Sequence, residues 1–369
     1  MTLTLAESET LFGQMLDGEL TDDAIRETLI TLADRGESAE EIAGAARAMR
    51  ARMLRITAPE GAIDVCGTGG DGSHSLNVST AVALVVAACE VPVAKHGNRA
   101  ASSKAGAADT LEALGLNLDR AAATVEASLA DLGIAFLFAQ KHHPALGPIM
   151  PIRREIGRRT IFNLLGPLCN PAGVTRQLVG VADPALVPVY AEALALLGTD
   201  SAMVVAGDEP LDELSVAGGS SLISIRYSPD SLSPTPARPE LVEGPSFTSD
   251  KAERKNGAST SSAQTGFVNL AGLAEIARIT PETAGLPRHP REALRGGDAT
   301  YNAAALRRLL LGEQETAQDR AYRDAVLLNS AAALMVAGHA TDWASGVEEA
   351  AEAIDKGLAN ALLNCWVRF

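Results

Sequence analysis

Short apolar runs alternate with alanine-rich stretches of helical length along most of the chain after Ile63. The apolar runs are "IDVC", "VPVAKH", "IAFLF", "QLVGVA" and "SAMVVAG", and the alanine-rich stretches span residues 80–90, 107–115 and 186–197. Strands that alternate with helices are typical of a mainly parallel sheet with helices on its faces. We therefore predict an α/β fold with a mainly parallel central sheet.

Polar loops follow three of these apolar runs. They contain the sequences "CGTGGDG", "KHGNRA" and "AGDEPLDE". In open α/β sheets, ligands bind in the crevice beyond the carboxyl ends of the strands. We therefore expect the three loops to share one crevice.

The N-terminal part of the chain has a helical pattern instead. Thr21 and Ser38 are candidate N-cap residues, and Glu41 completes a capping-box pattern with Ser38. Helical patterns return near the end of the chain. We predict a helical domain over residues 1–60 and an α/β domain over residues 61–369.

A proline-rich stretch at residues 228–266 interrupts the alternation. It contains five of the chain's 18 prolines, with many Ser and Thr residues and few apolar ones. Such a composition has little apolar surface to bury. Because the stretch lies between the β-like runs "SSLISIRY" and "AEIARIT", we predict a flexible insert within a hairpin.

The overall charge limits the classes of partner. A formal net charge of -15 would repel the nucleic-acid backbone and anionic membrane surfaces, so we predict neither as a partner. The four cysteines show no C-x-x-C spacing, and we find neither a signal peptide nor an apolar run long enough to span a bilayer. We expect a cytoplasmic protein.

The stretch "DVCGTGGDGSHSLNVST" at residues 64–80 has two interpretations. Gly67, Gly69 and Gly72 match the G-x-G-x-x-G pattern of dinucleotide-binding folds. However, Asp71 places a negative charge where a pyrophosphate would lie, and polar residues separate the third glycine from a helix that begins near Val78. A glycine-rich turn followed by a helix N-terminus also forms a phosphate cradle. We favour the phosphate cradle.

The side chains that follow this turn also suit a phosphate ligand. Ser75, Asn77, Ser79 and Thr80 offer hydroxyl and amide groups for phosphate oxygens and one hard cation. The alternative is an ordinary polar helix N-terminus.

Two further clusters extend the predicted site. "KHGNRAASSKAG" at residues 95–106 concentrates cations after an apolar strand, which favours an anion over a solvated face. "DEPLDE" at residues 208–213 is either a hydrated acidic turn or a magnesium site, because Mg²⁺ takes one or two carboxylates plus substrate oxygens. In the arginine-rich stretch 142–171, Arg153 or Arg154 could bind a carboxylate with both prongs of its guanidinium.

The motifs "GTGGDG", "NVST", "KHGNRA", "RREIGRRTIFNLLGPLCNP" and "LDELS" occur in the order and spacing of the anthranilate phosphoribosyltransferase family, which the chain closely resembles outside the insert. The resemblance implies a helical domain that also includes helices near 146–165, a large α/β domain and a homodimer. It also implies transfer of the 5-phosphoribosyl group from phosphoribosyl pyrophosphate to the amine of anthranilate, giving N-(5-phosphoribosyl)anthranilate and pyrophosphate in tryptophan biosynthesis, with Mg²⁺ as cofactor.

The resemblance also implies site residues. Anthranilate would contact Gly67, Asn98 and Arg153, and magnesium would bind Ser79, Asp212 and Glu213. His96 would either transfer a proton or orient the substrate. The residues implied for phosphoribosyl pyrophosphate are Gly67, Gly70, Asp71, Ser75, Asn77, Val78, Ser79, Thr80, Lys95, His96, Gly97, Asn98, Arg99, Ala100, Ala101, Ser102, Ser103 and Ala107.

The chain departs from the family pattern at a few positions. Ala107 replaces the usual Ser, Gln140 replaces the usual Pro, and the insert and the C-terminal "LLNCWVRF" are not family features.

Two other functions are alternatives. One is a pyrimidine nucleoside phosphorylase of related fold, and the other is a non-catalytic relative that binds nucleic acid. The negative charge and the Asp212–Glu213 pair disfavour the second alternative.

Overall fold

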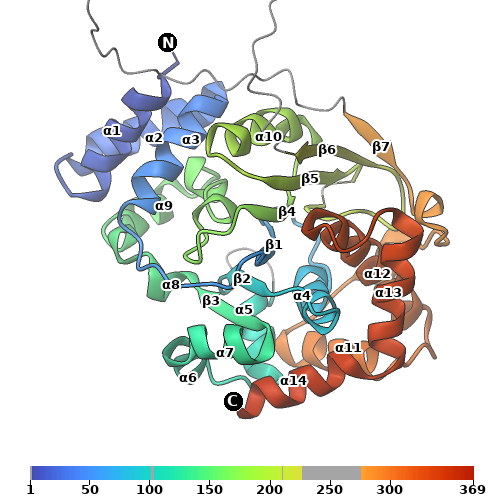
Figure 1. Ribbon diagram of the computed structural model, residues 1–369. Coiled ribbons are helices and arrows are strands. Elements are labelled where there is room, and N and C mark those ends of the chain that lie inside the picture. Colours follow the sequence, from blue (N-terminus) through green and yellow to red (C-terminus); the bar gives the residue numbers. More distant parts are fainter. Residues whose placement is uncertain (1, 101–103, 210, 227–275) are drawn as a thin grey trace, which may run out of the picture.

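The computed structural model describes residues 2–100, 104–209, 211–226 and 276–369. In this part of the chain a seven-stranded sheet has the order β3-β2-β1-β4-β5-β6-β7 (Figure 1). β1 to β5 pair in parallel, while β6 and β7 pair antiparallel at one edge. This confirms the predicted mainly parallel sheet. The strands are β1 Ile63–Gly67, β2 Val93–Gly97, β3 Ile134–Phe138, β4 Arg176–Gly180, β5 Ser201–Gly207, β6 Ser220–Arg226 and β7 Ala277–Ile279.

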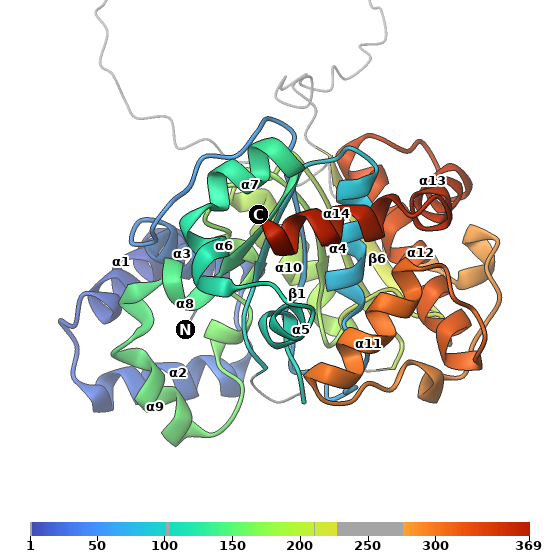
Figure 2. The same ribbon diagram turned by 90° about the horizontal axis from the view of Figure 1, so that it is seen from below.

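Helices cover both faces of the sheet, and even the edge strand β3 is therefore buried. All five residues of β3 are buried, as in its continuous apolar run "IAFLF". α4 (Val78–Ala88) and α12 (Ala317–Ala337) pack together on one face, and α10 (Val187–Leu196) lies on the other (Figures 1 and 2). The remaining helices of the α/β part are α5 Ala107–Ala113, α6 Leu118–Ala123, α7 Val125–Leu132, α8 Ala139–His142, α11 Ala299–Leu310, α13 Trp343–Asp355 and α14 Leu358–Arg368.

The N-terminal helices are α1 (Leu5–Leu16), α2 (Asp22–Arg35) and α3 (Ala39–Arg50). Both predicted N-caps form: the Thr21 hydroxyl accepts the Ala24 N–H, and Ser38 forms a capping box with Glu41. The 146–165 stretch contains α9 (Ile149–Ile156), which packs against α2 (Figure 2). α1, α2, α3 and α10 share one apolar core with β4, β5 and β6.

The edge hairpin is confirmed, because Ser220 of β6 pairs with Ile279 of β7. The predicted insert at 228–266 lies outside the described residues. All four cysteines are free. Among the described helices, none has the length and apolar character needed to cross a membrane.

Candidate active site

The strand order defines where a ligand would bind. β1 and β4 are neighbours, but the chain continues from β1 to β2 on one side and from β4 to β5 on the other. In open α/β sheets ligands bind at the carboxyl ends of strands at such a switch point. The loops after β1, β2 and β5 are the three that the sequence predicts to share a crevice.

Asp212 lies directly over the carboxyl ends of β1 and β4. A Cβ on Gly67 would lie 2.0 Å from Asp212 Oδ2, and a Cβ on Gly180 would lie 1.5 Å from the Asp212 carbonyl oxygen. Both positions therefore need glycine. The Gly69 N–H donates to Asp212 Oδ2 over 2.8 Å. The acidic loop and the glycine-rich loop are thus in direct contact.

The glycine-rich loop has backbone conformations that favour glycine. Gly69, Gly70 and Gly72 have φ angles of 69°, 77° and 67°. The N–H groups of Gly70, Asp71 and Gly72 have no acceptor among the described residues. Successive unpaired N–H groups form a concavity that binds anions. α4 begins at Val78, well beyond the third glycine, whereas a dinucleotide-binding helix would open at that glycine.

The start of α4 is fixed by hydrogen bonds from distant helices. Asn77 Oδ1 accepts from the Thr110 hydroxyl over 2.6 Å and from Asn302 Nδ2 over 2.9 Å. The Tyr322 hydroxyl donates to the Asn77 carbonyl oxygen. Thr80 Oγ1 is buried and has no partner in the described structure. The side chain of Asn77 is therefore used within the protein, while Thr80 keeps a free polar atom.

Ser79, Asp212 and Glu213, the three residues implied for magnesium, border one void of about 10 Å³. The Ser79 N–H donates to Glu213 Oε1 over 3.3 Å, and Glu213 Oε2 is buried without a partner among the described residues. Burial and the charge of Asp71 raise the pKa of Asp212 to about 7, and burial and Asp212 raise the pKa of Glu213 strongly. A neighbouring cation stabilises the ionised form of buried carboxyl groups whose pKa values are raised.

The other two acidic residues of "DEPLDE" are engaged elsewhere. Asp208 forms an ion pair with Arg278, and Glu209 Oε1 accepts from the Ser215 hydroxyl. Within the described residues, no group of three His, Cys, Asp or Glu side chains is arranged to hold a metal. A cation here would therefore need oxygens from its substrate, which is the usual arrangement for Mg²⁺.

Lys95 lies beneath this void. Its Nζ atom donates to the Val65 carbonyl oxygen over 2.7 Å and to Ser79 Oγ over 3.3 Å. Burial lowers the pKa of Lys95, while the buried carboxylate of Asp64 opposes this change. Asp64 in turn accepts the His96 N–H and an Asn170 N–H.

His96 is buried against a second imidazole. Its Nδ1 atom lies 2.9 Å from the Gly166 carbonyl oxygen, and its Nε2 atom lies 3.3 Å from His143 Nε2. Burial and His143 lower the pKa of His96 to about 3. His96 is therefore neutral at neutral pH.

The loop after β2 is only partly described, because Ala101, Ser102 and Ser103 lie outside the described residues. Gly97 is needed for close packing, since a Cβ there would lie 2.7 Å from the Phe136 ring. Asn98 Oδ1 accepts the Arg99 N–H over 2.8 Å. Ala100 donates its N–H to Asp109, and Ala107 begins α5.

Arg99 is turned toward the protein itself. Its guanidinium pairs with Asp109 and Glu112 and lies over the Phe138 ring at 5.6 Å. In this conformation Arg99 holds the loop to α5, and a bound substrate would have to compete with two carboxylates.

Arg153 has no ion pair among the described residues, unlike Arg158 and Arg159 nearby. Its guanidinium donates to Asn163 Oδ1 over 3.3 Å and lies 5.4 Å from the Phe162 ring centroid. Burial lowers its pKa. An unpaired, partly buried guanidinium held by neutral neighbours is available for a carboxylate.

Sequence reasoning missed several residues that build the site. Asn163 and Phe162 position Arg153, and His143 contacts His96. Asn163 and Phe162 lie in the quoted "TIFNLLGP" motif, which could have indicated them. No sequence motif indicated Gly180, because the close approach of Asp212 to this residue is visible only in the three-dimensional structure.

The comparisons with known proteins agree with this fold. Residues 1–53 match the helical bundle domain of a glycosyl transferase family, and residues 59–236 and 255–360 match its a/b domain. The chain is thus a glycosyl transferase of this two-part class.

Individual relatives narrow the class. The chain is 60% identical to an anthranilate phosphoribosyltransferase of Novosphingobium aromaticivorans, over 98% of this chain and 95% of that one. It is 56% identical to that of Sphingopyxis alaskensis, over 98% and 95%. The crystal structure of the Thermus thermophilus enzyme superposes with a TM-score of 0.80 at 36% identity, covering 100% of this chain and 96% of that one.

The chain belongs to the anthranilate phosphoribosyltransferase family. Its function is the transfer of the phosphoribosyl group of phosphoribosyl pyrophosphate to the amine of anthranilate, in tryptophan biosynthesis. The sequence-based prediction of family, fold and activity is confirmed, and the phosphorylase and nucleic-acid-binding alternatives are set aside.

Proposed function

We propose that phosphoribosyl pyrophosphate binds at the switch point, between the glycine-rich loop, the first turn of α4 and the loop after β2. The observation that supports this most directly is the row of unpaired N–H groups from Gly70 to Gly72 beside the unpartnered Thr80 hydroxyl. Such donors neutralise phosphate charge without any rearrangement of the backbone. The remaining residues that the resemblance implies for this substrate are proposed with the same role.

We propose that Ser79, Asp212 and Glu213 hold Mg²⁺. The buried, unpartnered Glu213 Oε2 and the raised pKa values of both carboxyl groups fit a divalent cation that shares its coordination with substrate oxygens. An anthranilate phosphoribosyltransferase from Saccharomyces cerevisiae was solved with phosphoribosyl pyrophosphate and Mg, and it superposes with a TM-score of 0.77 at 25% identity over 99% of this chain and 92% of that one. The cation would neutralise the charge of the departing pyrophosphate.

We propose that Arg153 binds the anthranilate carboxylate and that Asn98 and Gly67 line the acceptor site. Arg153 has the required free guanidinium, and Asn163 restricts its orientation. A planar, two-pronged donor fixes the direction of a carboxylate and therefore the direction of the amine on the same ring.

The proposed division of roles explains why no strong base is needed. Glycosyl transfer passes through an oxocarbenium-like state, so the leaving group must be neutralised and the nucleophile held in line. The aromatic amine of anthranilate is already neutral at pH 7. With a pKa near 3, His96 is a weak proton acceptor, which favours orientation of the substrate over proton transfer.

Three further expectations rest on the family resemblance. We propose that the chain forms a homodimer through its helical part, that it is cytoplasmic, and that its domains divide near residue 60. The four free cysteines support a reducing compartment.

The decisive assay mixes the purified chain with Mg²⁺, phosphoribosyl pyrophosphate and anthranilate, and follows the loss of anthranilate fluorescence. Calorimetry tests the cradle itself: we expect heat of binding with phosphoribosyl pyrophosphate and Mg²⁺ but none with NAD. Tight NAD binding would contradict the phosphate cradle.

A further inference from the structure

The neighbouring strands β1 and β2 part from each other toward the active site. β1 pairs with β4 from Ile63 to Gly67, and β2 pairs with β3 from Val93 to Gly97, so each strand is paired along its whole length on its other side. Between β1 and β2 themselves, Ile63 with Val93 is the one pair in register within the described residues. The backbone ladder therefore ends before the strands reach the glycine-rich loop and the loop after β2.

Side chains replace the missing ladder bonds in this gap. In a parallel ladder that continued to the ends of the strands, the His96 N–H would donate to the Val65 carbonyl oxygen. Instead, the His96 N–H donates to Asp64 Oδ1 over 3.1 Å, and the Val65 carbonyl oxygen accepts a hydrogen bond from Lys95 Nζ over 2.7 Å. One ladder bond is thus replaced by two bonds to side chains of opposite charge.

Asp64 is fully buried and is held by donors on both of its oxygens. Asn170 Nδ2 donates to Asp64 Oδ2 over 2.8 Å and to the Ala94 carbonyl oxygen over 2.7 Å, so the Asn170 amide bridges β1 and β2. Cys66 Sγ donates to the same Oδ2 atom over 3.4 Å. Because each of these partners is a donor, the contacts suit an ionised carboxylate.

Lys95 enters the gap from the opposite face of the sheet. Its Nζ atom also donates to Ser79 Oγ, on the face that α4 covers. Asp64 and Ala94 each follow the registered pair by one residue and point to the other face. Burial raises the pKa of Asp64, and the charge of Lys95 is the largest opposing cause. The two buried groups therefore compensate each other's charge across the gap.

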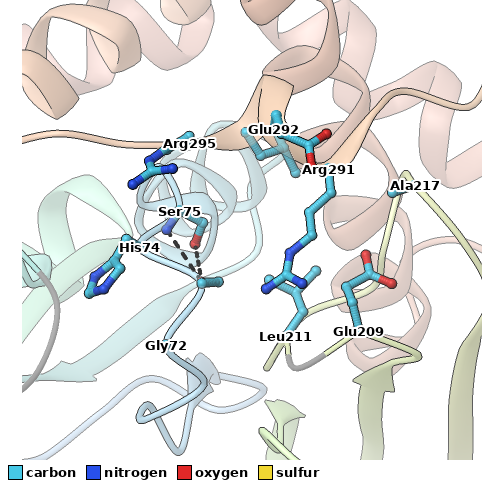
Figure 3. Close-up of a pocket in the computed structure, with 11 residues that line it drawn as sticks. Gly72, His74, Ser75, Glu209, Leu211, Ala217, Arg291, Glu292 and Arg295 are labelled. Carbon is cyan, nitrogen blue, oxygen red and sulfur yellow. Dashed lines mark hydrogen bonds between the residues drawn. The ribbon is translucent and has the colours of Figure 1, made fainter.

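The loops that border the gap are each fixed on their outer side. Figure 3 shows Ser75 of the glycine-rich loop beside the segment that carries Arg291 and Arg295, and Ser75 forms an antiparallel bridge with Arg295. The loop after β2 is fixed to α5, because Asp109 Oδ2 accepts the Ala100 N–H over 3.0 Å. The separation of the strand ends therefore sets the distance between the two loops.

We propose that Asp64 is a positioning residue for phosphoribosyl pyrophosphate, which acts through Lys95 and His96 to hold the ends of β1 and β2 apart at the spacing that this substrate needs. The inference rests on the proposed binding of the substrate between the loops after these strands. Asp64 itself contacts no substrate in that arrangement. A gap that is set before binding spares the substrate the cost of spreading the strands.

Asp64→Asn in the full chain tests this role. The variant keeps an acceptor for the His96 N–H, but it removes the charge that compensates Lys95 and puts an amide donor opposite the Asn170 amide. We expect the KM for phosphoribosyl pyrophosphate, and its calorimetric Kd with Mg²⁺, to rise by roughly tenfold or more, while kcat at saturating substrate stays within about threefold. A role in stability alone would lower the melting temperature and the yield of active enzyme and leave this KM unchanged. An unchanged KM in the folded variant would therefore overturn the proposal.

Glu41→Gln is the matched control, since it makes the same carboxylate-to-amide change in a fully buried side chain of α3, away from the sheet. It should lower the melting temperature and leave the KM for phosphoribosyl pyrophosphate unchanged; an equal rise of KM in this control would contradict a specific role for Asp64.

If Asp64→Asn does not fold, Asn170→Ala decides the question. This variant removes the amide that bridges Asp64 and the Ala94 carbonyl oxygen, but it leaves the charges of Asp64 and Lys95 in place. We expect a higher KM for phosphoribosyl pyrophosphate, and an unchanged KM would refute the positioning role.

A failure of the proposed substrate site would look different from a failure of this inference. Thr80→Val removes a buried, unpartnered hydroxyl that the proposed cradle offers directly to phosphate oxygens. In the same calorimetric titration, unchanged affinity in Thr80→Val contradicts the cradle. Unchanged affinity in Asp64→Asn, with weaker binding in Thr80→Val, contradicts the positioning role alone.

Discussion

Replacing Arg153 by alanine is the most informative test of the acceptor site. In the structure its guanidinium has only neutral neighbours, Asn163 at 3.3 Å and the Phe162 ring at 5.4 Å, so its removal leaves no carboxylate of the protein unpaired. The fall in kcat/KM for anthranilate then measures the missing contact between Arg153 and this substrate. Truncating one partner of a buried charge pair costs about 2–5 kcal/mol.

The expected free-energy cost of Arg153→Ala lies at the lower end of this range of about 2–5 kcal/mol, because the Arg153 side chain is only partly buried. A cost of about 2–3 kcal/mol corresponds to a roughly 30- to 150-fold lower kcat/KM for anthranilate. Binding of phosphoribosyl pyrophosphate should stay nearly unchanged. Arg153→Lys should recover part of the loss, since it restores the charge but not the planar fork.

Arg154→Ala provides the matched control, because Arg154 is exposed on the same helix and should leave the kinetics unchanged. Steady-state fluorescence kinetics at varied anthranilate and varied phosphoribosyl pyrophosphate separate the two substrates. If Arg153→Ala left the anthranilate parameters unchanged and impaired only phosphoribosyl pyrophosphate, Arg153 would belong to the phosphate site and the proposed division would be wrong.

Asp212→Asn combined with Glu213→Gln should lower turnover by about three orders of magnitude, since a metal contributes several kcal/mol to charge stabilisation; near-normal rates at saturating Mg²⁺ and substrate would refute the metal assignment. Deleting residues 229–265 and joining the hairpin with a short turn should preserve folding and activity, because loop-closure entropy changes slowly with length; gel filtration and the fluorescence assay would reveal a lost dimer or lost activity. Gly180→Ala should displace Asp212 and reduce both thermal stability and activity, because its Cβ would lie 1.5 Å from a backbone oxygen, whereas Gly166→Ala has open space and serves as control in a thermal melt.

Local patterns predicted the elements well, because each depends on neighbours in sequence. The runs "IAFLF" and "SAMVVAG" coincide with β3 and β5, and Thr21 and Ser38 cap the helices they precede. The order of the strands in the sheet could not be derived from local patterns, because it depends on which faces of the strands and helices pack together. The family resemblance supplied the activity, and the strand alternation supplied the fold class.

Side-chain partners were less predictable, because they are set by residues outside the motif itself. The "DEPLDE" motif contains four carboxylates, and two of them have partners away from the predicted metal site: Asp208 pairs with Arg278, and Glu209 accepts the Ser215 hydroxyl. Arg99 is predicted to bind the substrate, and in this structure its guanidinium pairs with Asp109 and Glu112. In both cases a nearby opposite charge or hydroxyl, invisible in the local motif, decides where the side chain points.

The apolar core shared by the N-terminal helices and the sheet has a consequence for the cooperativity of folding. Phe12 of α1 and Leu29 of α2 lie in the same continuous interior as Tyr190 of α10 and Val204 of β5. These residues form one continuous buried apolar cluster, and α10 packs against both α3 and the sheet, so melting the N-terminal helices would expose the apolar side of α10 to solvent. We therefore expect the two parts that sequence composition distinguishes to unfold in a single transition, and a core substitution in α1 to lower the stability of the strands that support the active site.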